Sequence, residues 1–319
     1  MSKFYDIFNG DADGLCALQQ LRLEEPRSTE LVTGVKRDLA LVSRVAAAPG
    51  DELTVLDVNL GDNVAAVERA LATGASVRYF DHHEPGRIPG HPNFKAYVDT
   101  AADVCTSLIV DRYLGGRQRL WAVVGAFGDN LVEAAVHAAS GLDLDHTELA
   151  RLHELGECLN YNAYGESIDD LHYPPAELYR TLSPYRDPRH FIYDEPVFDV
   201  LRSAFVEDVT HAEDVPLLSE GVHHAIVVLP DAAWSRRVNG LYGNRLAQRA
   251  PQRAHAVIVA RGDAYRVSVR APVAAPRDAG TLCRQFPSGG GRAGAGGINE
   301  LPQADLERFI AAFRATYDA

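Results

Sequence analysis

The first 130 residues alternate between strand-like and helix-like segments, and this alternation constrains the fold more than any other feature. Short apolar runs typical of buried strands cover residues 3–9, 31–35, 53–58 and 75–80. Helical patterns cover residues 15–23, 39–47 and 63–71 in the intervals between them. Strands that alternate with helices in this way pair in parallel, with helices on both faces of the sheet. We therefore predict an α/β fold built on a doubly wound parallel sheet.

The rest of the chain changes character twice. Residues 103–114 and 120–137 read as further helices, and residues 146–205 are mostly helical and interrupted by prolines. A smaller α/β pattern follows, with strands at 223–229, 256–260 and 265–270, helices at 239–248 and 303–317, and a glycine-rich loop at 288–297. We predict a large domain over 1–190, a helical connector over 191–220 and a smaller α/β domain over 221–319, with a cleft between the domains.

Charge is divided unevenly between these parts. The whole chain has a net charge of −13, but residues 221–319 carry 13 arginines, no lysine and 7 acidic residues, a net charge of +6. An acidic part can hold divalent cations, and a basic part can hold an anionic ligand. The charges alone leave a second interpretation open, namely an acidic surface joined to an arginine-rich composition with no division of function.

Other features bear on compartment and assembly. No apolar run approaches the roughly 20 residues that span a bilayer, and the first ten residues read as a strand rather than a secretion signal. The four cysteines are scattered without a C-x-x-C pair, which disfavours a disulfide framework or a zinc site. We expect a cytoplasmic protein with no membrane partner. A homodimer is compatible with this sequence.

Acidic residues follow the predicted strands, where a doubly wound sheet places its chemistry. They are Asp11 and Asp13 in the segment Asn9-Gly10-Asp11-Ala12-Asp13-Gly14, Asp57, Asp81 together with His82 and His83, and Asp129 in an apolar helix. The first motif and Asp57 are each compatible with a turn or a helix cap, and tandem histidines are often structural. Asp129 within an apolar helix is harder to explain in this way, because burying an unpaired carboxylate is costly. Converging carboxylates, however, repel one another unless a cation neutralises them, and a mixture of carboxylates and imidazoles suits Mn²⁺ or a comparable ion. Their order along the chain favours a metal site.

Basic residues accompany both parts. Lys36 and Arg37 follow the second predicted strand and could point at the rim of this site. Arg292 lies within the glycine-rich segment 288–297, whose backbone N–H groups could approach a phosphate closely. A flexible loop with no ligand is the alternative for that segment. The net charge of +6 in the same domain favours anion binding.

Together these motifs resemble the DHH phosphoesterase superfamily, which is named for the motif that reads Asp81-His82-His83 here. The similarity extends to Asp11-Ala12-Asp13-Gly14, Asp57, Asp129 and a C-terminal module like the DHHA1 domain, with Gly289-Gly290-Gly291-Arg292 as its phosphate loop. It covers residues 3–317. Members of this superfamily include manganese-dependent oligoribonucleases, cyclic-dinucleotide phosphodiesterases, RecJ-type exonucleases, exopolyphosphatases and family II pyrophosphatases.

The resemblance implies a role for each motif residue. The catalytic residues would be Asp57, Asp81, His82 and His83. Asp57 would bridge two Mn²⁺ ions, with Mg²⁺ or Co²⁺ as alternatives. Asp81 would orient the imidazoles of the two histidines. The first ion would be bound by Asp11 and Asn9, and the second by Asp13, His82 and Asp129. Substrate would be bound by His83, Gly289, Gly290, Gly291 and Arg292.

Three positions depart from the pattern of the relatives. Ile7 stands where many relatives have a histidine ligand, and Asn9 stands where RecJ-type members have an aspartate. An amide carbonyl can ligate but brings no charge, so we expect a weaker first metal site. Arg292 replaces a histidine and can bind phosphate in a planar fork, but it cannot exchange a proton near neutral pH.

We expect a manganese-dependent phosphoesterase that hydrolyses short phosphodiesters, either oligonucleotides or dinucleotides, with water activated by two metal ions. A net charge of +6 fits a short substrate better than long duplex nucleic acid, which needs an extended basic track. Two alternatives stay open. One is an exopolyphosphatase or pyrophosphatase acting on polyphosphate, and the other is a non-catalytic nucleotide- or phosphate-binding regulatory protein with an impaired first metal site.

Overall fold

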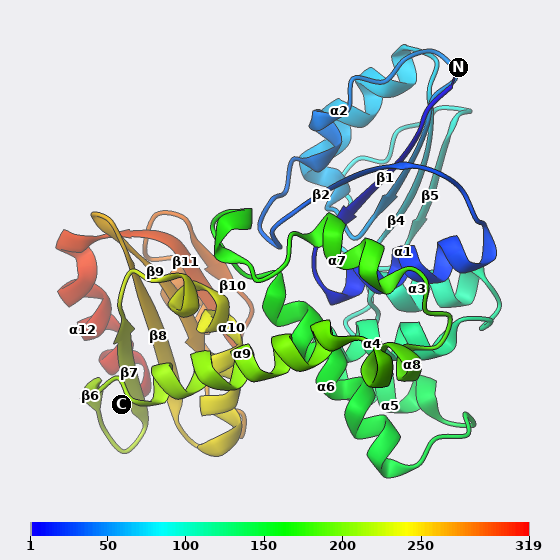
Figure 1. Cartoon of the computed structure of the whole chain (residues 1–319). Helices are drawn as coiled ribbons and strands as arrows, with labels where there is room; N and C mark the ends of the chain where they lie inside the picture. Colours follow the sequence, from blue (N-terminus) through cyan, green and yellow to red (C-terminus); the bar gives the residue numbers. More distant parts are fainter. Residues whose placement is uncertain (1, 319) are drawn as a thin grey trace. The chain divides into compact units, whose positions relative to one another are not determined.

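The computed structural model describes residues 2–318 and divides between Ser203 and Ala204 into two compact units, unit 1 and unit 2 (Figure 1). Helix α9 (Pro196–Glu213) runs through this division. The predicted connector, residues 191–220, contains the whole of α9, and the predicted domain limits stay predictions. Among residues 2–318, no helix combines the length and the apolar character needed to cross a bilayer.

Unit 1 is built on a parallel sheet of five strands in the order β2-β1-β3-β4-β5. The strands are β1 (Phe4–Asn9), β2 (Glu30–Gly34), β3 (Glu52–Leu56), β4 (Ser76–Asp81) and β5 (Phe94–Val98). Four of them lie where apolar runs predict strands. The sequence pattern misses β5, a short edge strand in which only Phe94 is buried and Lys95 interrupts the apolar run.

Helices cover both faces of this sheet. Helices α1 (Ala12–Glu24), α3 (Thr106–Tyr113) and α4 (Arg119–Gly128) belong to one side, and α2 (Leu60–Ala72) to the other (Figure 1). Side chains alternate between the two faces, so Phe8, Leu56 and Phe80 enter the first core while the neighbouring Val55 and Tyr79 enter the second. The doubly wound parallel fold predicted from the sequence is confirmed.

The remainder of unit 1 is helical, as the sequence predicts. Its elements are α5 (Val132–Ala139), α6 (His146–Asn162), a short 3₁₀ turn η2 (Ile168–Asp170), α7 (Pro175–Leu182), α8 (Pro188–Asp194) and the first part of α9. Prolines begin three of these helices, because the first turn leaves its N–H groups unpaired and the fixed φ of proline suits that position. The prolines therefore start helices here instead of only interrupting them.

Unit 2 contains a mixed sheet in the order β10-β11-β9-β8-β7-β6, in which only β7 and β8 pair in parallel. Its strands are β6 (Leu217–Glu220), β7 (His224–Leu229), β8 (Ala254–Arg261), β9 (Ala264–Arg270), β10 (Gly289–Gly291) and β11 (Ala295–Pro302). Its helices are α10 (Ala233–Arg249), α11 (Ala279–Cys283), the 3₁₀ turn η3 (Gln303–Asp305) and α12 (Leu306–Tyr317). This is the smaller α/β unit that the sequence predicts.

Three local predictions are wrong. The helix expected over 39–47 is reduced to one 3₁₀ turn, η1 (Leu41–Arg44). The single helix expected over 120–137 is broken into α4 and α5, with Asn130 in the left-handed region at φ 61°, so Asp129 caps α4 rather than lying within a helix. The open loop expected over 288–297 is a hairpin of β10 and β11.

A buried ion pair in unit 1 provides a test of its stability. Asp6 on β1 is fully buried and accepts hydrogen bonds from Arg22 Nε at 2.8 Å and from Thr29 Oγ1 at 2.8 Å. We predict that Asp6→Ala lowers the free energy of unfolding by about 3–5 kcal/mol, because it leaves a largely buried guanidinium without its partner. The measurement is urea unfolding followed by Trp121 fluorescence, in a Trp234→Phe background.

Glu30→Ala is the matched control for this variant. Glu30 pairs with Lys3 at 2.7 Å, but both side chains are more than half exposed, so the loss is expected to be at most about 1 kcal/mol. Equal losses in the two variants would show that burial does not decide the strength of the Asp6–Arg22 pair.

Candidate metal centre

The acidic motifs of unit 1 meet at the carboxyl ends of its strands. In the order β2-β1-β3-β4-β5, the chain leaves β1 and β3 toward opposite sides, and ligands of such folds bind at this point. A pocket of about 240 Å³ opens there. It is lined by Asn9, Asp11, Lys36, Asp38, Leu39, Asp57, Val58, Asn59, Asp62, His82, His83 and Asp129.

The first motif is held by two helix starts. Asp11 caps α1 by accepting from the Gly14 N–H at 3.0 Å. Asp13 accepts from two backbone N–H groups at the start of α3, those of Thr106 and Ser107, each at 2.7 Å. A side chain on Gly14 would place its Cβ 2.2 Å from the Asn9 carbonyl oxygen, which explains the glycine of the motif. The two carboxylates are therefore fixed before any ion is considered.

Asp57 occupies a strained position. Its backbone lies in the left-handed region at φ 57°, which is uncommon for residues other than glycine, although aspartate adopts it more often than most. Its side chain is buried and accepts from Thr106 Oγ1 at 3.2 Å. A strained backbone that carries a buried carboxylate is typical of a functional position.

The two histidines have different partners. His82 Nδ1 lies 3.0 Å from the Val104 carbonyl oxygen, so this nitrogen donates to it and Nε2 is the ring nitrogen that faces the pocket. That Nε2 lies 3.4 Å from Asp57 Oδ1 and 3.9 Å from Asp129 Oδ2. His83 Nδ1 lies 2.7 Å from Asp81 Oδ1. Asp81 thus orients His83, whereas a backbone carbonyl orients His82.

The predicted ligands of the second ion are brought together. One ligand atom each from Asp13, His82 and Asp129 lies within 4.8 Å of the others, and the same holds for Asp57, His82 and His83. Neutral imidazole nitrogen and carboxylate oxygen are suitable ligands for a divalent transition metal. The residues at this point therefore fit a divalent ion.

The predicted ligands of the first ion have other partners. Asn9 uses both ends of its amide on the backbone, since Oδ1 accepts from the Asp11 N–H at 3.3 Å and Nδ2 donates to the Lys36 carbonyl at 3.5 Å. Asp11 Oδ2 accepts from Lys36 Nζ at 2.5 Å. Lys36 thus lies inside the site rather than at its rim. Its place directly after β2 at the same edge of the sheet is the sequence signal for it.

The carboxylates of the pocket are crowded. Burial, followed by the charges of Asp11, Asp13 and Asp129, raises the pKa of Asp57 well above its ordinary value. Burial also raises the pKa of Asp129, although Lys36 opposes the effect. For Asp11, burial is outweighed by Lys36 and the Gly14 N–H, and its pKa is lowered. The pocket therefore carries more negative charge than its own cation neutralises.

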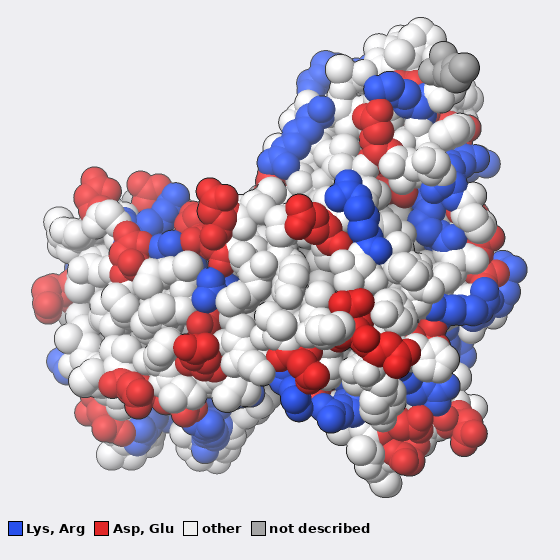
Figure 2. Space-filling view, in the orientation of Figure 1, with Lys and Arg blue, Asp and Glu red and all other residues white. Residues whose placement is uncertain are grey.

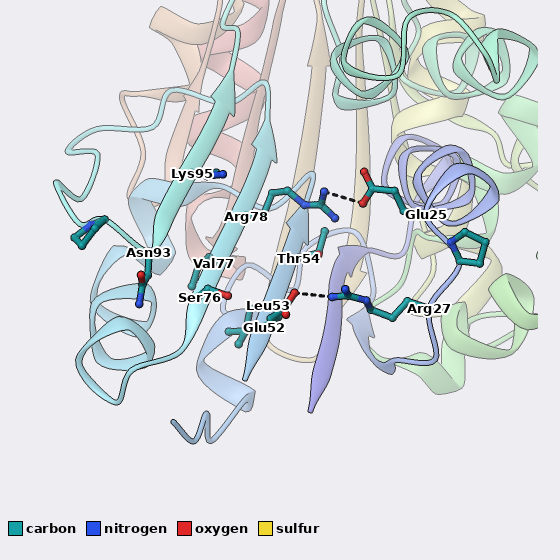
Figure 3. Close-up of a pocket in the computed structure, with 12 residues that line it drawn as sticks. Glu25, Arg27, Glu52, Leu53, Thr54, Ser76, Val77, Arg78, Asn93 and Lys95 are labelled. Carbon is teal, nitrogen blue, oxygen red and sulfur yellow. Dashed lines mark hydrogen bonds and ion pairs between the residues drawn. The ribbon is translucent and has the colours of Figure 1, made fainter. Parts of the chain in front are cut away.

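A larger pocket of about 600 Å³ lies at the opposite, amino-terminal ends of the strands (Figure 3). Arg78 pairs there with Glu25 at 2.8 Å, and Arg27 pairs with Glu52 at 2.5 Å. Neither histidine nor aspartate occurs among its lining residues, and both glutamates are already neutralised. We place the chemistry in the smaller pocket, where unneutralised carboxylates and imidazoles converge.

No protein-family model and no curated protein sequence matches this chain, but solved structures resemble it. Exonuclease RecJ bound to manganese has a TM-score of 0.62 at 16% identity, over 98% of this chain and 89% of the other. The DHH domain of a member of a ribosomal-protein family has a TM-score of 0.62 at 13% identity, over 99% and 86%. The pGpG-specific phosphodiesterase PggH from Vibrio cholerae has a TM-score of 0.58 at 15% identity, over 98% of each chain.

The chain has the fold of these structures, one of which is a DHH domain. The resemblance seen in the sequence motifs is thereby confirmed at the level of the fold. The DHH motif itself, Asp81-His82-His83, ends β4 and enters the pocket through its two imidazoles.

The glycine segment of unit 2 is an ordered edge of the sheet. Gly289 has no room for a side chain, because a Cβ there would lie 1.8 Å from the Cys283 carbonyl oxygen. Arg292 follows β10 in the hairpin turn and is exposed. Arg284 Nη1 donates to the Gly291 carbonyl at 2.9 Å, so a second guanidinium lies beside the glycines. The sequence motifs do not point to Arg284, which directly follows α11 and is not part of the glycine segment.

The crowding of carboxylates around Asp57 leads to a prediction. We predict that Asp57→Asn raises the thermal midpoint of the ion-free protein by a few degrees and weakens Mn²⁺ binding at least about tenfold. Asparagine removes one repelling charge and tolerates the left-handed backbone, and about 1 kcal/mol shifts the midpoint of a domain of this size by about 2–4 °C. Calorimetry with and without Mn²⁺ measures both effects.

Asp62→Asn is the control, since Asp62 lines the same pocket from the first turn of α2 but is exposed. Asp62→Asn should change neither the thermal midpoint nor the Mn²⁺ affinity appreciably. A lower thermal midpoint for Asp57→Asn together with an unchanged Mn²⁺ affinity would contradict the prediction. It would show that Asp57 neither destabilises the ion-free protein by charge repulsion nor binds the ion.

Proposed function

We propose that this chain is a metal-dependent phosphoesterase. The observation that carries the proposal is the convergence of Asp13, His82 and Asp129 in one pocket, with His82 Nε2 facing the carboxylates. Asp57 would be the fourth ligand. Mixed nitrogen and oxygen donors favour Mn²⁺, with Mg²⁺ and Co²⁺ as alternatives. RecJ, which shares the fold, has been solved with manganese bound.

A bound divalent ion would lower the pKa of a water molecule and neutralise charge on a phosphoryl group. The chain's own residues would position the substrate beside it. Burial lowers the pKa of His83, but its hydrogen bond to Asp81 and the nearby carboxylates outweigh burial and raise it. With Nδ1 held by Asp81, His83 would present a protonated Nε2 to a phosphate oxygen.

Short phosphodiesters are the substrate class that we propose. On the surface of each unit that Figure 2 shows, the described basic and acidic side chains are interspersed and form no unbroken basic track. Long duplex nucleic acid would need such a track. Among proteins of the same fold, PggH is named as a pGpG-specific phosphodiesterase, and this favours a dinucleotide or short oligonucleotide.

A substrate panel with Mn²⁺ tests this proposal. Product release is measured from a linear dinucleotide, a longer oligonucleotide, polyphosphate and pyrophosphate, with Asp57→Asn as the inactive control. Fastest release from the dinucleotide supports the proposal. Fastest release from polyphosphate or pyrophosphate would identify the phosphohydrolase alternative. Tight Mn²⁺ binding without turnover on any member would instead identify a regulatory phosphate-binding protein.

The glycine segment and Arg292 are proposed to bind a phosphate that is not cleaved. We predict that Arg292→Ala raises KM for the dinucleotide about ten- to a hundredfold, because a hydrogen bond to a charged group contributes about 1.5–3 kcal/mol. The kcat value should change little, since such a contact is similar in the ground and transition states. Steady-state kinetics of the dinucleotide reaction measures both constants.

The control for this variant is Arg253→Ala, which removes an ion pair with Glu220 at the other edge of the same sheet and should leave KM unchanged. Hydrolysis of a small nitrophenyl phosphodiester should be unaffected in both variants. A collapse of small-ester hydrolysis in Arg292→Ala would place Arg292 at the cleaved group instead.

A further inference from the structure

The ammonium group of Lys36 is surrounded by acceptors within the carboxylate pocket. Nζ lies 2.5 Å from Asp11 Oδ2, 3.1 Å from Asn160 Oδ1 and 3.5 Å from Asp129 Oδ1. The ammonium group donates hydrogen bonds to Asp11 and Asn160 and forms an ion pair with Asp129. The side chain is only 24% exposed, so this cation is part of the interior of the site.

Lys36 is held in place by a helix outside the acidic motifs. Its backbone N–H donates to the carbonyl of Ala163 at 2.9 Å, immediately after the end of α6. Asn160, in the last turn of α6, is buried and directs its amide oxygen at the ammonium group. A neutral amide exerts no long-range attraction on a lysine. The position of Lys36 is thus specified by packing and hydrogen bonding as well as by the carboxylates.

Asn9 is matched to this arrangement. Its Nδ2 donates to the carbonyl of Lys36, and its Oδ1 accepts from the backbone of Asp11. An aspartate at position 9 could not donate to that carbonyl and would lose this hydrogen bond. Ile7 cannot ligate an ion and is fully buried in the core on one face of the sheet. Neither position 7 nor position 9 therefore adds a charged ligand beside Asp11.

The charges of the pocket agree with a single ion. The carboxylates of Asp11, Asp13, Asp57 and Asp129, one ammonium group and one divalent ion leave one net negative charge. Two further carboxylates line the pocket, but Asp38 is paired with Arg44 and Asp62 is exposed. A second divalent ion would make the group positive before substrate arrives, and it would compete with Lys36 for the same oxygen of Asp11. A second divalent ion bound beside the first and close to the Lys36 ammonium group would also be repelled by both cations.

We infer that the ammonium group of Lys36 takes the place of a second metal ion, so that the site binds one divalent ion and uses Lys36 as its other cation. This inference rests on the proposed function as a metal-dependent phosphoesterase and specifies which cations its site would contain. Lys36 would stabilise charge on the phosphoryl group as a fixed donor. Activation of water would fall to the single ion held by Asp13, His82 and Asp129.

Manganese stoichiometry tests this inference in the full chain. The purified protein is equilibrated with Mn²⁺, and bound ions are counted by elemental analysis and examined by electron paramagnetic resonance. The wild type should hold one ion per chain with the spectrum of an isolated Mn²⁺. The double variant Asn9→Asp, Lys36→Met should hold two ions with an exchange-coupled spectrum, because a vacant carboxylate pair replaces the ammonium group.

Two single variants complete the design. Lys36→Met should reduce dinucleotide turnover about a hundredfold in its one-ion state, by analogy with the loss of a single transition-state donor. Lys95→Met is the matched control, since Lys95 is exposed on β5 and lies outside this pocket. It should match the wild type in ion count and turnover. Circular dichroism identifies any variant that fails to fold, and the wild-type count does not depend on the variants.

The outcomes separate this inference from the proposed function. Two coupled ions in an active wild type would overturn the role of Lys36 and leave the phosphoesterase intact. A folded double variant that still holds one ion would also overturn it. A wild type that binds no ion and hydrolyses no phosphoester would overturn the proposed function, and this inference would fall with it.

Discussion

The mutual repulsion of Asp11, Asp13, Asp57 and Asp129 is the constraint on which the rest of unit 1 depends. Parallel strands bring these carboxylates to one end of the sheet, where Asp11, Asp13 and Asp57 are buried and Asp129 is partly buried. In such surroundings a carboxylate is stable only when charge or hydrogen bonds compensate for lost hydration. The elements nearest the pocket supply that compensation.

Three helices begin at the acidic pocket. The first turns of α1 and α3 donate backbone N–H groups to Asp11 and Asp13, and the Leu60 N–H at the start of α2 donates to Asp81 at 3.3 Å. Helix N-termini carry partial positive charge and bind anions. The doubly wound topology therefore provides part of the counter-charge with its backbone, because each helix that follows a strand starts at this edge. Lys36 and the proposed divalent ion would supply the remainder of the positive charge.

The sequence predicts the sheet and the order of the acidic motifs because both depend on local patterns of apolar residues and turns. It predicts less well where tertiary contacts decide. Residues 39–47 have a helical pattern but form only one 3₁₀ turn, and Asp129 lies at a helix end that apolar periodicity alone does not reveal. The contact between Lys36 and Asn160 joins residues from opposite halves of unit 1, and periodicity carries no information about such a pair.

Asp57 shows how function and stability oppose each other in this pocket. Its left-handed backbone, its burial and its like-charged neighbours each disfavour the folded state, and together they aim one carboxylate at the centre of the site. If a bound metal ion were the only cation in the pocket, the carboxylates of a newly folded, metal-free chain would have no neutralising charge. Lys36 is covalently part of the chain and is present from the start, so on the proposed arrangement it stabilises the carboxylate pocket during folding and later faces the substrate. Lys36 would then contribute both to the stability of the fold and to the binding of substrate.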